Sequence, residues 1–128
     1  MTSGSCLCGG VAFEISEPLR PVVGCHCSQC RKQSGHFGAF TASDDQYLKF
    51  TADATLAWYR ATETAGRGFC KTCGSLLFWK GDGNSYTEIA AGCIDGATGL
   101  KLEGHIFCAD KGDYYEILDG EYQHPQWT

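Results

Sequence analysis

Short segments in which apolar and polar residues alternate recur along this chain. Val11–Ile15 (VAFEI) shows this alternation and predicts a β-strand with one buried face. Further segments rich in β-branched and aromatic residues follow at intervals of about 8–15 residues, separated by turn-forming residues. They are Phe37–Thr41, Tyr47–Thr51, Leu56–Arg60, Ser75–Trp79, Tyr86–Ala91, His105–Cys108 and Tyr114–Ile117. We expect the first two of these to pair with each other, linked by the polar residues 42–46 (ASDDQ).

The pattern predicts very little helix. Only Ser28–Gln33 (SQCRKQ) is typical of a helical turn, with Ser28 as the expected N-cap and Gly35 as the stop signal. Many short strands without a long helix predict a mainly β fold, in which antiparallel sheets pack on each other in a small domain. No repeat or linker interrupts the chain, so we expect one domain over residues 1–128, with residues 120–128 as a loosely held C-terminal tail.

Composition and charge narrow the possible partners. The 128 residues carry a net charge of −5, and no run of Lys or Arg offers the positive surface that nucleic acid requires. The first twenty residues contain no apolar stretch long enough for a signal peptide or a membrane helix. We therefore expect a soluble, cytoplasmic protein without nucleic-acid or membrane partners.

Nine cysteines are a high number for a chain in a reducing compartment. Disulfides form mainly in exported proteins, whereas closely spaced cysteines in a cytosolic chain are more typical of metal ligands or redox centres. Seven of the nine fall into three clusters: Cys6 and Cys8; Cys25, Cys27 and Cys30; and Cys70 and Cys73. A glycine follows both the first and the third cluster, as in zinc knuckles, where it lets the backbone curl around the ion.

The seven thiols divide most simply into four and three. Cys6, Cys8, Cys70 and Cys73 complete a tetrahedron, which predicts a closed structural zinc site that staples the fold together. Cys25, Cys27 and Cys30 then predict a second, more labile site with one open position, the arrangement that catalytic zinc sites use. Alternatives remain for both groups: the four could be two redox dithiols, one thiol of the three could replace a ligand of the closed site, and His26 could be a fourth ligand.

The sequences around these cysteines resemble a known family. CLCGGVAFEI, CHCSQCRKQSG and RGFCKTCGS, in this order and followed by HIFCADKGDYYEILDG, are similar to the glutathione-dependent formaldehyde-activating enzymes, which share their domain with centromere protein V. The resemblance covers nearly the whole chain and includes Arg31, Gly35 and Arg67 at matching positions. It implies a β-rich fold with two zinc sites, with Cys6, Cys8, Cys70 and Cys73 as structural ligands.

The resemblance also implies a reaction. Cys25, Cys27 and Cys30 match the ligands of the second zinc, beside which glutathione binds as co-substrate, so these cysteines are the candidate catalytic residues. The implied enzyme is a carbon–sulfur lyase that joins formaldehyde to glutathione as S-hydroxymethylglutathione; its partners are a small-molecule thiol and an aldehyde. Arg31 and Arg67 are the candidates for binding the glutathione carboxylates, because arginine grips a carboxylate with two hydrogen bonds.

Two other functions fit the same residues. One is a non-catalytic zinc-binding module, and the other is a thiol-redox or zinc-buffering protein that uses the three-cysteine cluster. Cys93 and Cys108 lie outside every cluster, and we expect them to be buried, unreactive thiols.

Overall fold

The computed structural model describes residues 1–128 and shows a mainly β protein, as the sequence predicts. Eleven strands form two sheets, and α1 (Ser28–Ser34) is the only α-helix. The chain divides into two compact units, each built from two separate stretches: Met1–Arg20 with Thr41–Gly99, and Pro21–Phe40 with Leu100–Thr128. None of the helices has both the length and the apolar character that a membrane crossing requires.

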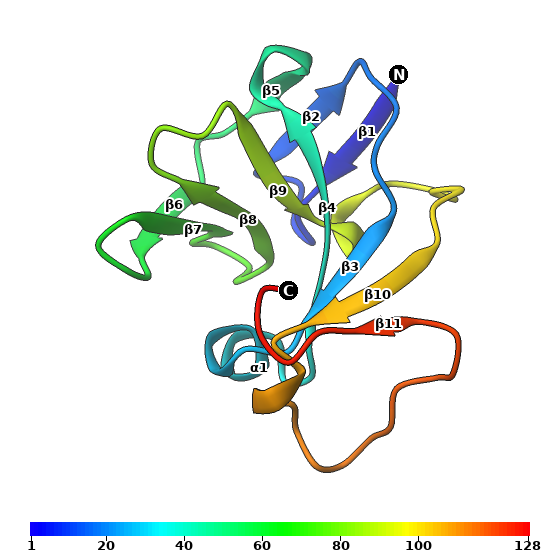
Figure 1. The fold of residues 1–128 in the computed structure, drawn as a ribbon. Coiled ribbons are helices and arrows are strands. Elements are labelled where there is room, and N and C mark those ends of the chain that lie inside the picture. Colours follow the sequence, from blue (N-terminus) through cyan, green and yellow to red (C-terminus); the bar gives the residue numbers. More distant parts are fainter. The chain divides into compact units, whose positions relative to one another are not determined.

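The first unit contains an antiparallel three-stranded sheet. Its strands lie in the order β1 (Thr2–Ser5), β2 (Ala12–Ile15), β5 (Leu48–Ala52) (Figure 1). β1 is not predicted by the sequence pattern, because TSGS has no apolar residue to mark a buried face. Glycine at position 4 lets β1 lie close to β2, since a Cβ atom there would lie 2.2 Å from the ring of Phe13.

Four more strands of the first unit follow one another as antiparallel neighbours (Figure 1). They are β6 (Leu56–Arg60), β7 (Ala65–Cys70), β8 (Leu76–Gly81) and β9 (Tyr86–Ala90). The glycine-rich β7 was not predicted, because Gly66 and Gly68 interrupt its hydrophobic pattern. The small residue has a packing role: a Cβ atom at Gly68 would lie 3.0 Å from the Phe78 ring and 3.1 Å from that of Trp58.

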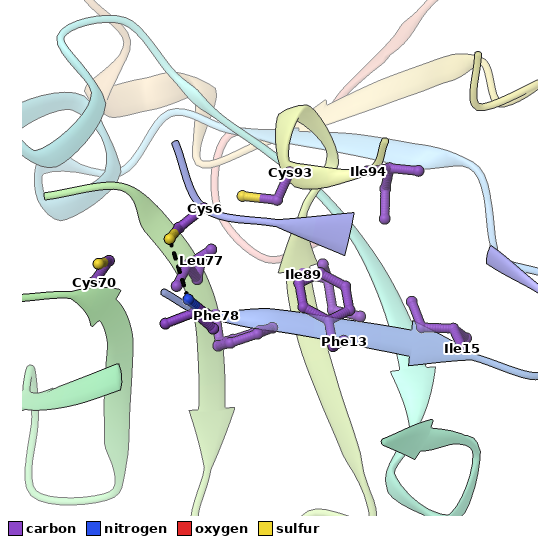
Figure 2. Close-up of a cluster of buried hydrophobic side chains, with 10 residues drawn as sticks. Cys6, Phe13, Ile15, Cys70, Leu77, Phe78, Ile89, Cys93 and Ile94 are labelled. Carbon is purple, nitrogen blue, oxygen red and sulfur yellow. Dashed lines mark hydrogen bonds between the residues drawn. The ribbon is translucent and has the colours of Figure 1, made fainter. Parts of the chain in front are cut away.

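The core of the first unit joins both sets of strands. Phe13, Phe50 and Phe78 pack edge to face, with the centroids of the Phe13 and Phe78 rings 5.3 Å apart. Figure 2 shows the buried cluster around these rings, with Cys6 and Cys70 among its members. Two candidate metal ligands are thus anchored directly in the hydrophobic core.

The second unit is built around strands in the order β11 (Tyr122–Gln123), β10 (Leu102–Ile106), β3 (Val22–Cys25), β4 (Gly38–Asp44), the last with its first three residues in this unit. β3 and β4 are antiparallel, but β10 runs parallel to both β3 and β11. The parallel pairs were not expected, because a single sequence does not show which distant segments become neighbours.

Two expectations about strands are wrong. The segments Phe37–Thr41 and Tyr47–Thr51 do not pair with each other, since β4 pairs with β3 and β5 pairs with β2. A 3₁₀ turn over Asp45–Tyr47, capped by Asp44, separates them instead of a tight hairpin loop. Residues 114–117 form no strand, and the backbone carbonyl of Tyr115 accepts a hydrogen bond from the Lys111 ammonium group rather than from a neighbouring strand.

The C-terminal residues are held more firmly than the sequence suggests. Tyr122 and Gln123 pair with β10, and the backbone N–H of Phe107 donates to the carbonyl of Gln126 at 2.8 Å. The N–H of Cys108 also donates to the carbonyl of His124, at 3.0 Å. These backbone hydrogen bonds tie residues 122–126 to the end of β10, so this segment is part of the second unit.

Candidate metal centres

Four cysteines of the first unit converge on one point. The Sγ atoms of Cys6, Cys8, Cys70 and Cys73 all lie within 4.8 Å of one another. The Sγ atoms of Cys6 and Cys8 are 3.7 Å apart, and those of Cys8 and Cys70 are also 3.7 Å apart. Zinc–sulfur bonds of about 2.3 Å in a tetrahedron separate the sulfurs by about 3.8 Å, whereas a disulfide holds them at about 2.05 Å. The spacing therefore fits a tetrathiolate zinc site and does not fit disulfides.

Cys70 and Cys73 form a knuckle of the kind that the sequence predicts. The backbone N–H of Cys73 points at the Sγ of Cys70 (3.4 Å), and the N–H of Gly74 donates to the carbonyl of Cys70 (2.8 Å). Gly74 has a φ of 79°, in the left-handed region that glycine adopts without strain. The N–H of Cys73 directed at sulfur stabilises a thiolate, as a metal ligand requires.

Cys6 and Cys8 form the second half of this group. The N–H of Gly9 donates to the carbonyl of Cys6 at 3.1 Å, and Gly9 has a φ of 80°. The N–H of Val11 donates to the Sγ of Cys6 at 3.3 Å, which is the dashed contact in Figure 2. Both glycines that the sequence assigns to knuckles thus have the expected backbone conformation.

The thiols of this group have pKa values that are shifted in opposite directions. The pKa of Cys73 is lowered to about 5, first by the hydroxyl and then by the backbone N–H of Ser75. The pKa of Cys8 is raised to about 11, because hydrogen bonds with the thiols of Cys6 and Cys70 outweigh the opposing effect of the Gly10 N–H. Crowded thiols resist ionising together, and a divalent cation among them would remove that conflict.

The second unit brings Cys25, Cys27 and Cys30 together, with all three Sγ atoms within 4.8 Å of one another. Cys25 ends β3, Cys27 caps α1, and Cys30 lies in the first turn of the helix. Hydrogen bonds with the thiols of Cys27 and Cys30, followed by burial, raise the pKa of Cys25. Three thiolates would occupy three corners of a tetrahedron around zinc and leave the fourth open.

The local geometry of Cys27 and Cys30 repeats that of the knuckle in the first unit. The N–H of Cys30 points at the Sγ of Cys27 (3.4 Å), and the N–H of Arg31 donates to the carbonyl of Cys27 (2.9 Å). Here the chain continues as a helix until Gly35, whose φ of 80° ends it as the sequence predicts. The expected N-cap, Ser28, is wrong by one residue, because the side chain of Cys27 accepts the capping hydrogen bond.

His26 lies between two of these cysteines, but its ring nitrogens are engaged elsewhere. Nδ1 is hydrogen-bonded to the hydroxyl of Tyr115, and Nε2 lies 2.7 Å from Nδ1 of His105. The imidazole is fully buried, and this burial, together with His105 and Lys111, lowers the pKa of His26 to about 4. In this arrangement neither ring nitrogen points at the three thiols, which argues against His26 as a fourth ligand.

The two candidate arginines lie in different units. Arg31, on α1, has a buried Nε that donates to no atom of the protein. Arg67, on β7, has only 5% of its surface exposed, and its charge acts on the nearby Glu88, whose pKa is raised by burial despite Arg20 and Arg67.

Of the two cysteines outside the groups, Cys93 is buried as expected, whereas Cys108 is not fully buried. The Sγ of buried Cys93 donates to the carbonyl of Leu76 at 3.2 Å, and burial raises the pKa of this thiol to about 11. Cys108 is half-buried, and burial also raises its pKa. Both shifts make the reactive thiolate form scarcer near neutral pH.

The sequence placed His105 in a predicted strand and gave no sign that Glu121 and Tyr115 join the two buried histidines of this unit. The imidazole of His105 is 3% exposed, and its Nε2 lies 2.8 Å from a carboxylate oxygen of Glu121. These residues occupy no motif with a fixed spacing, so only the three-dimensional arrangement reveals their connection with His26.

Comparisons with known proteins identify the family to which this chain belongs. An uncharacterised lyase of Schizosaccharomyces pombe is 29% identical over 120 residues, which span 91% of this chain and 85% of the relative. A crystal structure of a Rhodobacter sphaeroides protein is similar with a TM-score of 0.59 and 26% identity, over 76% of this chain and 91% of that one. The family model described as glutathione-dependent formaldehyde-activating enzyme matches residues 1–110, so this chain belongs to that family.

Proposed function

We propose that this protein is a zinc-dependent enzyme of the carbon–sulfur lyase type, which joins formaldehyde to glutathione or forms a related thiol–aldehyde adduct. The observation that carries the proposal is the division of seven thiols into a group of four and a separate group of three. The family description and the lyase named among the relatives support the same reaction class.

The group of four is assigned to structure. Cys6 and Cys70 are buried in the core of the first unit, with 4% and 0% of their surfaces exposed, and the four thiols saturate a tetrahedral ion. Structural zinc contributes about 10–16 kcal/mol of apparent binding free energy in small zinc domains. This group therefore supplies stability and leaves no position for substrate.

The group of three is assigned to the reaction. Zinc held by Cys25, Cys27 and Cys30 would supply a Lewis acid that favours the thiolate of glutathione or polarises the aldehyde oxygen. The N–H of Cys30, which donates to the sulfur of the capping residue Cys27, holds this thiol in place before any ligand arrives. The residues that hold the site would thus bring thiol and aldehyde together in one place, which accelerates an addition that is already favourable in water.

Arginine side chains are assigned to the two carboxylates of glutathione. Arg31 follows Cys30 directly, and its buried Nε lacks a hydrogen-bond acceptor within the protein. A carboxylate is the acceptor that the planar guanidinium binds best. Arg67 is the second candidate, because it lies at a position that matches the family.

The proposal is tested by measuring zinc per chain and then titrating the zinc-quantified protein with glutathione in a calorimeter. Two zinc ions per chain, one of them removed easily by a chelator, together with saturable glutathione binding, are the expected result. An assay of S-hydroxymethylglutathione formation above the uncatalysed rate completes the test. One firmly held zinc without glutathione binding would instead identify a non-catalytic zinc-binding module, and a second zinc that exchanges freely without glutathione binding would identify a zinc buffer.

A further inference from the structure

Four polar side chains of the second unit form a continuous line of hydrogen bonds. The hydroxyl of Tyr115 meets Nδ1 of His26, Nε2 of His26 lies 2.7 Å from Nδ1 of His105, and Nε2 of His105 lies 2.8 Å from Oε1 of Glu121. The two histidines in the middle are, as whole residues, 0% and 2% exposed, whereas Tyr115 and Glu121 are only partly buried. The line therefore connects two accessible ends through a buried centre.

The chemistry of the groups gives this line a direction. An ionised carboxylate only accepts hydrogen bonds, so Glu121 requires a proton on Nε2 of His105. With His105 neutral, its Nδ1 is an acceptor, and this requires a proton on Nε2 of His26. Nδ1 of His26 is left as an acceptor in turn, and the hydroxyl of Tyr115 must donate to it.

The surroundings hold Tyr115 in place to make this contact. Its ring stacks on that of His26 at an interplanar angle of 23°, and the ring of His36 meets it edge-on with the centroids 4.2 Å apart. The Lys111 ammonium lies 4.2 Å from the centroid of the Tyr115 ring and also donates to its backbone carbonyl. With its proton turned towards His26, the phenolic oxygen presents its remaining lone pairs away from that ring.

We propose that Glu121 is a positioning residue, which acts through His105 and His26 to orient the hydroxyl of Tyr115 as a hydrogen-bond acceptor for the substrate. The oxygen of Tyr115 would accept a hydrogen bond from the thiol of the substrate or from the hydroxyl of the thiol–aldehyde adduct. The segment that carries Tyr115 packs on the helix of the three-cysteine group: the hydroxyl of Tyr114 donates to the carbonyl of Gly35 at the end of α1 (3.1 Å), and the charge of Arg31 acts on Tyr115. The identity of the ligand rests on the proposed function, but the direction of the hydrogen bonds does not.

The direction is tested by NMR of the zinc-loaded, ¹⁵N-histidine-labelled full chain. We expect His26 and His105 both to carry their proton on Nε2 and none on Nδ1. In Glu121→Gln the amide can donate as well as accept, so we expect Nδ1-protonated forms to appear at both residues. Glu116→Gln, which changes an exposed carboxylate of the same segment, is the matched control and should leave both tautomers unchanged.

A double-mutant cycle tests the link with the reaction. Losing one hydrogen bond to substrate should lower kcat/KM about 3- to 10-fold in Tyr115→Phe, with zinc content unchanged. Glu121→Gln should show a loss of similar size, and the double variant should lose no more than either single one, because both changes remove the same contact.

Two results would overturn the proposal: a proton on Nδ1 of His26 in the unmodified protein, or losses from Glu121→Gln and Tyr115→Phe that simply add. If the unmodified protein forms no thiol–aldehyde adduct, the proposed reaction fails, and the tautomers still decide the direction of the hydrogen bonds.

Discussion

Cys8 and Cys70 are 62 positions apart in the sequence, yet their Sγ atoms lie 3.7 Å from each other. Cys8 follows β1 and Cys70 ends β7, so the contact joins the N-terminal sheet of the first unit to its other set of strands. A shared zinc ion would make this contact favourable, because it would neutralise thiolates that otherwise repel one another. The stability of the first unit should therefore depend on the metal.

Replacing Cys73 by serine should destabilise the protein severely. Ser75 and backbone N–H groups lower the pKa of Cys73, which makes it the thiol of this group best prepared to bind zinc. Losing one of four ligands removes much of a binding free energy of about 10–16 kcal/mol. This loss is comparable to the whole free energy of unfolding of a typical small domain. We expect insoluble or unfolded protein, measured by soluble yield and circular dichroism.

Cys108→Ser is the matched control for this prediction. Cys108 is half-buried and belongs to neither group of thiols, so this variant should fold and bind as much zinc as the parent. A stable, soluble Cys73→Ser protein with full zinc content would contradict the structural assignment.

Cys27→Ser should separate the metal at the second group from the fold. Serine is among the preferred N-cap residues, so its hydroxyl can replace the sulfur that caps α1. The hydroxyl does not replace the thiolate as a zinc ligand. We expect the zinc content to fall by one ion per chain and adduct formation to cease, while the thermal unfolding temperature changes little. Loss of folding would assign Cys27 to structure instead.

The sequence predicted the grouping of the cysteines better than the topology of the strands. Metal ligands carry a local signal, because two thiols and a trailing glycine must lie within one turn, and Gly9 and Gly74 have the positive φ that this turn requires. Strands with regular alternation, such as Leu56–Arg60, were located with the same bounds as β6. The four-and-three division follows from coordination number, which is independent of the fold.

What the sequence did not show depends on distant neighbours. The polar β1 is a strand because β2 offers it backbone partners, and the glycine-rich β7 is one because its small residues fit under aromatic rings. The link from Glu121 to His26 joins residues with no common motif, through His105, which the sequence placed only in a predicted strand. Such relationships are set by tertiary packing, which single-sequence patterns do not encode.

Arg31→Lys should weaken glutathione binding while leaving zinc in place. The planar guanidinium offers several N–H donors in a fixed fork, whereas lysine has one flexible ammonium group and no group equivalent to the buried Nε. We expect the dissociation constant, measured by calorimetry, to rise about 10-fold. Lys32→Gln, which removes an exposed positive charge at the next position, is the control and should change it little. Equal effects of both variants would indicate general electrostatic attraction rather than a specific contact.

Asp45→Asn should lower stability at neutral pH but not in acid. The carboxylate of Asp45 accepts hydrogen bonds from Lys80 and from Thr87 (2.7 Å), and these outweigh partial burial to lower the pKa of Asp45. A lowered pKa stabilises the folded state above the unfolded value of about 3.9 and ceases to do so as the pH falls through the folded value. The ion pair is partly exposed, so we expect a loss of only about 0.5–1 kcal/mol at pH 7.

This difference is measured by urea unfolding of both proteins across pH. It should shrink towards zero below about pH 4. Comparing the variant with its parent at the same pH cancels the contribution of zinc, whose thiolate ligands also take up protons in acid. Asp53→Asn, an exposed site of the same unit, should show no such pH-dependent difference. A constant difference for Asp45→Asn at all pH values would refute the electrostatic explanation.

Gly104→Ala should detach the C-terminal strand from β10. Gly104 pairs with Tyr122, and a Cβ atom there would lie 2.1 Å from the Tyr122 ring, so the ring must move or the strands must separate. Overpacking of this kind costs about 1–3 kcal/mol. We expect faster hydrogen exchange at the amides of His124 and Phe107, which bond β10 to this segment, and a lower unfolding temperature.

Gly92→Ala is the control for this prediction: it adds the same methyl group where no atom lies within 4 Å, so it should leave the exchange rates and the unfolding temperature unchanged. Unaltered exchange at His124 in Gly104→Ala would show that this glycine is not what allows β11 to pair with β10.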